Sequence, residues 1–557
     1  MTALSGKTII LGLAGIDWPG MAERVAAGRL PAIARLIARG TAGRMLASAA
    51  PDGPAAWATL ATGLPAETHG IILPEEPWAG GQRPIGRFAW RADPVWLRLA
   101  DAGIATASVG WPVTAPGSAW PGVHIDARFA TAGGKVPQDW LLPPGVAPDD
   151  WRERLRDLRM HPLDVTGTML APFVPALMTI DQAREHRLVD LALMIARLSS
   201  GHAAAMALLQ DAPWQALFVH HRWIEEVQAR FAHAAPPFDG VVDAAWTLLD
   251  ALVGATVAAL PDDATILLVS PGSLGRAGLL AAAGPGIAAG QQLRGAAARD
   301  LAPTLFARFG LADPALPGRA LLAHAAPLRL LDPARPPAEA SAPDAADLAR
   351  VAAFGHAPPR VPPAWQARRL AAEAEMLLTR DPAAAGRRAE AALALDPNLI
   401  SALGARAAAH VAAEEAEPLP ALADRIAAAA PGHLWEALIR VGYHALRGEA
   451  GLAQPYLKRV EADGGPEDLL RAGAAWMMLK RPADAARVFE AALASQPDNV
   501  SALLGLAMAR MHRPLLAETP LRRVLDLDPG QAVARDALAD LLRRTGRGGE
   551  AIVIGRD

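Results

Sequence analysis

The sequence predicts two domains of different class: an α/β domain with a mostly parallel sheet sandwiched by helices, and then an all-α solenoid. Three observations support this prediction. Short β-rich runs alternate with helical patterns from residue 7 to about residue 330. A stretch rich in Pro and Ala follows, and beyond it apolar residues recur with helical spacing and a longer period. The chain has 557 residues, which is too many for one hydrophobic core.

Four runs in the first domain are predicted to be strands, at residues 8–13, 105–110, 215–220 and 264–270. The last is apolar on both faces, as expected of a central strand in a parallel sheet. The first lies in an apolar run at 8–16 that could suggest a signal peptide, but the run is short and no small-x-small cleavage pattern follows. A helix is expected to begin at Asp300 as its N-cap, with Pro303 in the first turn.

Changes of composition predict the domain boundaries. We assign residues 1–330 to the α/β domain, 331–363 to a Pro/Ala-rich linker, 364–545 to the helical domain and 546–557 to a C-terminal tail. The linker contains many prolines, which favour extended backbone, and one short helix is expected near residues 344–353.

The helical domain carries an internal repeat. Prolines close apolar helical stretches at Pro397, Pro431, Pro497 and Pro529, and their separations are 34, 66 and 32 residues. A period of about 34 residues is that of tetratricopeptide repeats. Residues 467–529 resemble two such units, with small and large side chains where paired helices cross: Gly473, Trp476, Ala485, Phe489 and Ala492, then Gly505, Met508, Ala517, Leu521 and Val524. About five stacked units would share one continuous core.

This resemblance implies that the helical domain binds a protein or peptide, by analogy with other tetratricopeptide proteins. The tryptophans Trp365, Trp435 and Trp476 are predicted to pack between helices and not to contact a ligand. The reason is that aromatic side chains usually supply buried area to a core.

Composition narrows the possible partners and cofactors. Lys+Arg number 54 and Asp+Glu 57, and no long basic run is present, so nucleic acid is not an expected partner. Cys is absent, which excludes disulfides and thiolate metal sites and fits a reducing compartment. No later apolar run reaches the length of a membrane span. We therefore expect a cytoplasmic protein without a transmembrane segment, in which any metal is held by Asp, Glu or His.

Three stretches of the first domain are informative together. The first covers residues 11–18 and 28–40, the second 54–63, 69–71 and 110–116, and the third 284–287 and 300–305 with Gly310 and Gly318. In order and spacing they resemble the bacterial type I phosphodiesterase/nucleotide pyrophosphatase branch of the alkaline phosphatase superfamily. The resemblance implies an alkaline-phosphatase-like fold. In enzymes of that family two metal ions, commonly zinc, are held by Asp and His beside a Thr or Ser nucleophile.

The resemblance also implies that the start of the catalytic set is lost. The family's first metal ligand is an Asp in the turn after the first strand, and that turn here reads Gly12-Leu-Ala14-Gly. The nucleophile precedes a Pro-x-x-Trp sequence, and Gly53 stands there before Pro54. Neither Ala14 nor Gly53 has a side chain that can bind a metal or attack phosphorus.

Later ligand positions are changed as well. The family's Asp-x-x-x-His motif aligns with residues 225–229, so Glu225 replaces the Asp and Ala229 replaces the His. The Ser-Asp-His-Gly turn aligns with residues 270–273, where Pro271 and Gly272 occupy the two ligand positions. The last family His aligns with Leu274. Losing these ligands together avoids the like-charge repulsion that a vacant site with several carboxylates would suffer.

Other acids and histidines could rebuild a site, and each also has a structural interpretation. Asp17 and Asp52 fit caps or turns, and the glutamate pair fits a solvated helix start. The two histidines fit polar residues at a strand end, although His221 and Glu225 could share a helix face if the helix began early. His69 is predicted to make a local hydrogen bond in its turn. The full set near the former ligand segments is Asp17, Asp52, His220, His221, Glu225 and Glu226.

The sequence therefore predicts a protein with a phosphodiesterase fold and no catalytic, metal-binding or cofactor-binding residues. We expect the first domain to act as a scaffold or ligand sensor and the repeat domain to recruit another protein. Two alternatives stay open: a divergent phosphodiesterase with two divalent metals such as zinc, and a binder of a phosphorylated or sulfated ligand without turnover.

Overall fold

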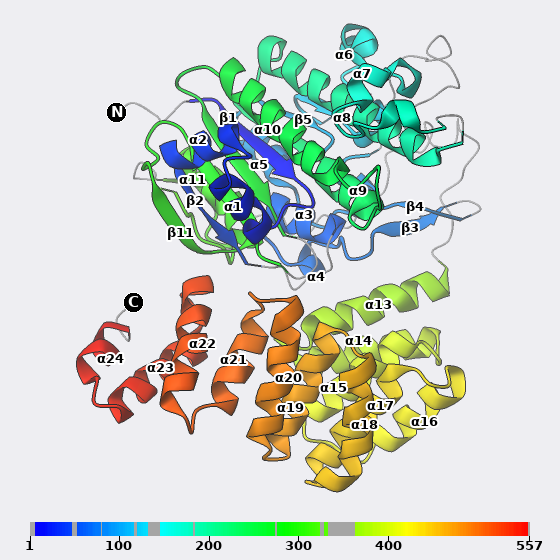
Figure 1. Cartoon of the computed structure of the whole chain (residues 1–557), viewed down its shortest axis with the longest axis vertical. Coiled ribbons are helices and arrows are strands. Elements are labelled where there is room, and N and C mark those ends of the chain that lie inside the picture. The colour runs from blue at the N-terminus through cyan, green and yellow to red at the C-terminus, as the bar shows by residue number, and fades with distance from the viewer. Residues whose placement is uncertain are drawn as a thin grey trace. The chain divides into compact units, whose positions relative to one another are not determined.

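The computed structural model describes residues 6–46, 53–78, 81–115, 120–131, 145–181, 184–272, 276–322, 328–331 and 362–554. Two compact units divide the chain (Figure 1): residues 1–71 with 85–342, and residues 72–84 with 343–557. The first unit contains a mixed sheet covered by helices and the second is a helical repeat, which confirms the predicted fold class. The helix expected at 344–353 lies outside the described residues.

A nine-stranded sheet forms the centre of the first unit. Its strand order is β11 (Gln291–Ala296), β2 (Thr41–Met45), β10 (Gly278–Ala283), β9 (Thr265–Ser270), β1 (Thr8–Leu13), β8 (Ala216–His221), β5 (Thr106–Val109), β6 (Val123–Ile125), β7 (Val146–Ala147). The four predicted strands are β1, β5, β8 and β9, and they run parallel to one another. All residues of these four strands are buried, which explains their apolar sequences.

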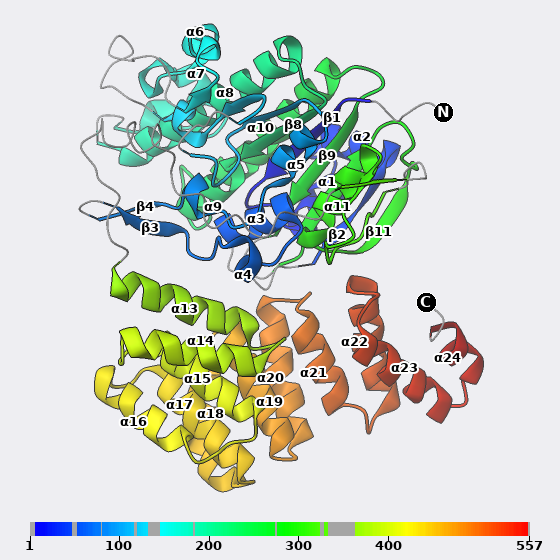
Figure 2. The same cartoon turned by 180° about the vertical axis from the view of Figure 1, so that it is seen from behind.

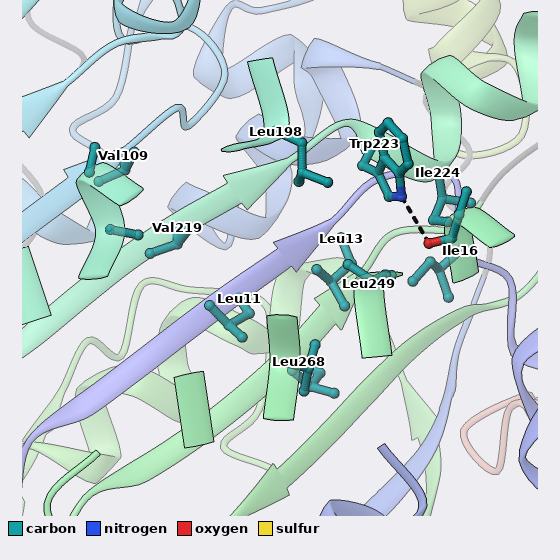
Figure 3. Close-up of a cluster of buried hydrophobic side chains, with 14 of the residues drawn as sticks. Leu11, Leu13, Ile16, Val109, Leu198, Val219, Trp223, Ile224, Leu249 and Leu268 are labelled. Atoms are coloured by element: carbon teal, nitrogen blue, oxygen red, sulfur yellow. Dashed lines mark hydrogen bonds between the residues drawn. The ribbon is translucent and has the colours of Figure 1, made fainter. Parts of the chain in front are cut away.

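Helices cover both faces of the sheet (Figures 1 and 2). The larger apolar cluster, part of which is drawn in Figure 3, includes side chains of α1 (Trp18–Ala26), α2 (Pro31–Arg39), α6 (Asp150–Leu155), α7 (Gly167–Leu170), α8 (His186–Asp211), α9 (Trp223–Phe231) and α10 (Val241–Ala259). A second cluster includes side chains of α3 (Pro54–Thr62), α5 (Val95–Asp101) and α11 (Leu301–Arg308). The unit thus has the helix–sheet–helix layers of an α/β fold.

The helices α8 and α10 are long and apolar enough to cross a membrane by length and composition alone. Both contribute buried side chains to the larger cluster. In α10, the carboxylate of Asp250 accepts hydrogen bonds from the backbone N–H groups of Ala32 and Ile33 at 3.0 and 2.8 Å. The apolar character of the two helices is therefore explained by the core that they share.

Asp300 does not cap α11 in the predicted way. It ends the 3₁₀ turn Ala298–Asp300, with φ −84° and ψ −14°, which is helical backbone and not the extended backbone of a capping residue. Its carboxylate accepts from the N–H groups of Ala297 and Arg319, each at 2.9 Å. The Asp300 carboxylate therefore binds the backbone of the segments around the helix start, and it does not accept a hydrogen bond from the first turn of α11.

The second unit consists of paired helices. Their bounds are α13 (Pro363–Leu377), α14 (Pro382–Leu395), α15 (Ile400–Ala412), α16 (Leu419–Ala429), α17 (Leu434–Leu446), α18 (Ala450–Asp463), α19 (Pro466–Met478), α20 (Pro482–Ser495), α21 (Val500–Ala509), α22 (Pro514–Leu527), α23 (Ala532–Arg544) and α24 (Gly548–Ile554). The last helix occupies the stretch expected to be a tail. The unit also includes the hairpin of β3 (Glu75–Trp78) and β4 (Gly81–Pro84).

Aromatic side chains fill the crossings between these helices. Phe489 is buried, and a Cβ atom at Gly473 or Gly505 would lie 2.6 or 2.5 Å from its ring. Trp476 is also buried and donates from its indole to Glu461 at 2.8 Å. Glycines at 473 and 505 are therefore required for the close approach of α19, α20 and α21.

The other two tryptophans also make contacts within this unit. The ring of Trp435 would lie 2.6 Å from a Cβ atom at Gly404, so it packs on α15. The indole of Trp365 donates to the carbonyl of Glu75 at 3.1 Å, which ties α13 to the hairpin. Trp435 and Trp476 thus pack between helices as predicted, whereas Trp365 hydrogen-bonds the hairpin and does not.

Candidate functional site

The carboxyl ends of the parallel strands β1, β5, β8 and β9 meet at one edge of the sheet. In open α/β sheets, this edge is where ligands bind. The register sets Gly12 of β1 beside His220 of β8 and beside Val269 of β9. The positions that the resemblance assigns to metal ligands on these strands therefore lie next to one another.

The turn after β1 packs against the start of α9 through its backbone. Ala14 donates to the carbonyl of His221 at 2.9 Å, and its own carbonyl accepts from the N–H of Glu225 at 3.2 Å. Gly15 has φ +80°, and a Cβ atom there would lie 2.4 Å from the nitrogen of Glu225. Only glycine fits this approach. At the assigned ligand position, Ala14 offers a buried methyl group.

The position assigned to the nucleophile precedes α3. Gly53 has φ +110°, a conformation that side-chain-bearing residues rarely adopt, and α3 begins after it without a side-chain cap. A Cβ atom at residue 53 would meet no atom within 4 Å. Backbone conformation, and not lack of space, therefore favours glycine here. Asp52 lies outside the described residues.

The turn after β9 is held by Ser270. Its hydroxyl donates to the carbonyl of Ile16 at 2.7 Å and accepts from the N–H of Gly272 at 3.3 Å. Gly272 has φ +95°. The serine hydroxyl thus ties the ends of β1 and β9 together, and the residues assigned to two ligand positions, Pro271 and Gly272, have no donor side chain. Ser273 and Leu274 lie outside the described residues.

The acids near the site are bound to arginines. Glu225 pairs with Arg222 at 3.1 Å and Glu226 pairs with Arg197 at 3.0 Å, both at the start of α9. Asp17 caps α1 through the N–H of Gly20 at 2.7 Å, and it also pairs with an arginine, Arg276, at 3.1 Å. Each carboxylate therefore has the structural partner that its cap or helix-start interpretation requires.

The two histidines are the last residues of β8, which is the strand-end position predicted for them, and both are buried. His220 is 7% exposed and His221 is 8% exposed. Since α9 begins at Trp223, His221 belongs to the strand and does not share a helix face with Glu225. The ring of His220 packs edge-on against Trp57, with the ring centroids 4.3 Å apart.

Burial makes the uncharged imidazole the stable form in this region. Desolvation lowers the pKa of His221 to about 3, and the charge of His202 acts in the same direction. Desolvation also holds the pKa of His220 well below its usual range, with a smaller contribution from Arg222. Burial lowers the pKa of His69 to about 3. The imidazole of His69 accepts from the N–H of Ile71 and contacts the hydroxyl of Thr59, each at 3.1 Å, so it makes local hydrogen bonds.

A pocket of about 170 Å³ opens beside these strand ends. It lies between the ends of β5, β6 and β8 and the helices α8 and α9. Of the residues that line this pocket, the sequence indicated Gly110 only as part of a motif. It did not indicate Arg197, Gly201 or Asp126 as site residues. The rule that ligands bind at carboxyl ends of parallel strands could have indicated Gly110 and Asp126. The residues of α8 carry no such signal, because its position over the strands depends on tertiary packing.

A metal centre requires several donor side chains around one point. Within the part of the chain that the structure describes, no three side chains of His, Asp or Glu are grouped closely enough to hold a metal ion. The described residues therefore offer hydrogen-bonding groups and paired charges at this edge, and not a ligand set for two metals.

Solved structures are similar to parts of the chain. A phosphonoacetate hydrolase from Sinorhizobium meliloti 1021, in complex with phosphonoformate, is 15% identical over 48% of this chain and 56% of its own, with a TM-score of 0.31. The Cut9–Hcn1 structure matches at 19% identity over 34% of this chain, with a TM-score of 0.29. YrrB, a tetratricopeptide repeat protein with an unusual peptide-binding site, matches at 19% identity over 31% of this chain, with a TM-score of 0.22.

The chain spans 39% of the length of the Cut9–Hcn1 chain, whereas its match to YrrB spans 91% of that shorter protein. At such TM-scores the likenesses say nothing about function. No curated protein matches the chain. The family model of type I phosphodiesterase / nucleotide pyrophosphatase matches residues 8–273, a range that runs from β1 to the turn after β9 and includes the strand ends described above. The first domain of the chain therefore belongs to the type I phosphodiesterase / nucleotide pyrophosphatase family.

Proposed function

We propose that the first domain is a noncatalytic member of its family and that the chain acts as a scaffold or adaptor, with the helical repeats binding a protein or peptide. One observation supports the proposal most strongly. The positions assigned to the first metal ligand and to the nucleophile are Ala14 and Gly53, and neither has a functional group. The backbone before α3 favours glycine, since Gly53 has φ +110°.

The chemistry of the family explains why these losses matter. Two metals polarise the phosphoryl oxygens, lower the pKa of the nucleophile and stabilise the leaving oxygen. A hydroxyl or carboxylate must be present to attack phosphorus if a covalent intermediate is formed. Among the described residues at the assigned positions, Glu225 keeps a carboxylate, and the others have methyl, hydrogen or proline side chains, which can neither bind a metal nor attack phosphorus.

A divergent metal-dependent phosphohydrolase is the alternative. It would have to use acids that now pair with arginines, such as Glu225 with Arg222. Breaking that pair to bind a metal would leave a guanidinium beside the cation, which is unfavourable. This arrangement supports the noncatalytic function over the alternative.

The repeat domain supplies the interaction surface in this proposal. A stack of helical pairs has a continuous core and an extended face that can bind an extended or helical segment of another protein. Buried Trp476 and Phe489 stabilise this stack from within.

The test measures the metal content and hydrolytic activity of the intact protein. The chain is purified without chelator, its zinc and manganese are quantified, and hydrolysis of bis-p-nitrophenyl phosphate is followed with added Zn²⁺ or Mn²⁺. We expect substoichiometric metal and no turnover above background. Near-stoichiometric metal together with turnover that His221→Ala and Glu225→Ala abolish would contradict the proposal.

A further inference from the structure

The pocket beside the strand ends is lined by none of the residues at the positions that the family uses for metals and nucleophile. Those positions lie on the turns after β1 and β9, before α3, and on α9 at Glu225 and Ala229. The pocket instead is bounded by Gly110 at the end of β5, His221 at the end of β8, Gly201 of α8 and Arg222 at the start of α9. It can therefore hold a ligand whether or not the domain is catalytic.

His221 is a buried polar group that lines this pocket without a partner. Neither ring nitrogen of His221 has a hydrogen bond within the described part of the chain, although the side chain is only 8% exposed. Its nearest aromatic neighbour is His202, with the ring centroids 6.0 Å apart. The ring nitrogens of His221 are not among the fully buried polar atoms that lack a partner, so they are accessible from the pocket that the residue lines. A ligand with a hydrogen-bonding group would satisfy this imidazole.

The polar side of the pocket favours an anionic group. Arg197 and Arg222 both line it, and each pairs with one glutamate, which leaves other guanidinium N–H groups for a ligand. The helix α9 begins at the pocket without a side-chain cap, and its first-turn N–H groups carry partial positive charge. Two carboxylates also line the pocket, and each is paired with an arginine: that of Asp126 with Arg128 at 2.7 Å and that of Glu226 with Arg197 at 3.0 Å.

The other walls are apolar and limit the size of the ligand. Val109, Phe129, Leu198 and Trp223 line them, and the pocket volume is about 170 Å³. An apolar cavity of about 150 Å³ is known to hold benzene. We propose that the pocket between β5, β6, β8, α8 and α9 binds a small organic anion, with an apolar body about as large as one aromatic ring and a single anionic group against Arg197, Arg222 and His221.

Phenylacetate is the probe for this site. Isothermal titration of the full chain with phenylacetate should show saturable binding, whereas benzyl alcohol, which lacks the charge, should bind at least tenfold more weakly. A tenfold ratio corresponds to about 1.4 kcal/mol, which the loss of one charge-assisted hydrogen bond accounts for. Inorganic phosphate, which lacks the apolar body, should also bind at least about tenfold more weakly. Titration with phenyl phosphate then shows whether the pocket accepts a phosphate in place of the carboxylate. If phenylacetate binds, the proposal stands whether phenyl phosphate binds or not, because the proposal requires one anionic group and does not specify which.

A blocking variant ties the binding to this pocket. A Cβ atom at Gly201 meets no atom within 4 Å, so Gly201→Leu fits the helix and extends into the pocket. It should weaken phenylacetate binding by at least about tenfold. Gly451→Leu, at another open helical position in α18, is the matched control and should leave binding unchanged. Arg222→Gln should weaken binding about tenfold without filling space.

Two outcomes would overturn the proposal. One is the absence of saturable phenylacetate binding to a chain whose thermal unfolding is normal. The other is equal binding to the wild type and to a folded Gly201→Leu variant, which would place the ligand elsewhere. If Gly201→Leu fails to fold, the comparison of Arg222→Gln with the wild type decides in its place, and unchanged affinity there counts against the site.

Discussion

Replacing Gly505 by alanine should destabilise the repeat domain, although alanine is the better helix former. A Cβ atom at residue 505 would lie 2.5 Å from the ring of Phe489, which is buried between α19 and α21. The helix gains about 1 kcal/mol from the exchange of glycine for alanine. Overpacking costs about 1 to 3 kcal/mol, so we expect a net loss of about 1 kcal/mol.

The sign of this effect should reverse when the ring is removed. In a Phe489→Leu background the clash is relieved, and Gly505→Ala should then stabilise the helices by up to about 1 kcal/mol. The coupling between the two substitutions should reach about 1 to 3 kcal/mol, as expected of residues in contact. Gly451→Ala, where a Cβ atom meets nothing within 4 Å, is the control and should stabilise equally in both backgrounds.

Hydrogen–deuterium exchange of α19 to α21 measures this cycle, because it reports the local free energy of opening in a chain with more than one domain. Exchange should be faster in Gly505→Ala than in the wild type and slower in the double variant than in Phe489→Leu. If Gly505→Ala slowed exchange by the same factor in both backgrounds, the close approach at Phe489 would be wrong.

Two further predictions concern the first domain. The pKa of His69 and of His221 falls from about 6.5 unfolded to about 3 folded, so the unfolded chain binds more protons below pH 6.5. The contribution of each histidine to the free energy of unfolding should be fully present above pH 6.5 and should fall by up to about 2 kcal/mol at pH 5. Thermal unfolding measured between these pH values should show a smaller loss of stability in His69→Gln than in the wild type. Gly15→Ala should cost about 2 kcal/mol or more in urea unfolding, because its Cβ atom clashes with Glu225. Gly28→Ala has the same backbone strain at φ +70° without a clash, so an equal loss there would refute the steric reason.

The central strands of the fold could be predicted because they are buried on both faces. Residues 8–13 and 264–270 read as continuous apolar runs, and the structure places them at the middle of the sheet as β1 and β9. The strand β11 was not predicted, since Gln291–Ala296 is largely exposed and carries no alternating pattern. The sequence did not predict that the hairpin of β3 and β4 belongs to the second unit. The hydrogen bond from Trp365 to Glu75 that ties it there joins residues far apart in the sequence.

The site was partly predictable for a similar reason. The absence of a functional group at Ala14 and Gly53 is visible in the sequence itself. The burial of His220 and His221 was not visible, because it depends on side chains distant in sequence: the ring of Trp57 packs on His220, and His202 of α8 lies beside His221. The pocket was not predictable either, since it forms where α8 crosses strand ends that are distant in sequence.

The metal content of the intact protein, measured with its hydrolysis of bis-p-nitrophenyl phosphate, tests the noncatalytic function most directly. We predict less than one equivalent of bound zinc or manganese after purification without chelator, and no hydrolysis above background when either metal is added. About two equivalents of tightly bound metal, with turnover that disappears in His221→Ala and Glu225→Ala, would contradict it.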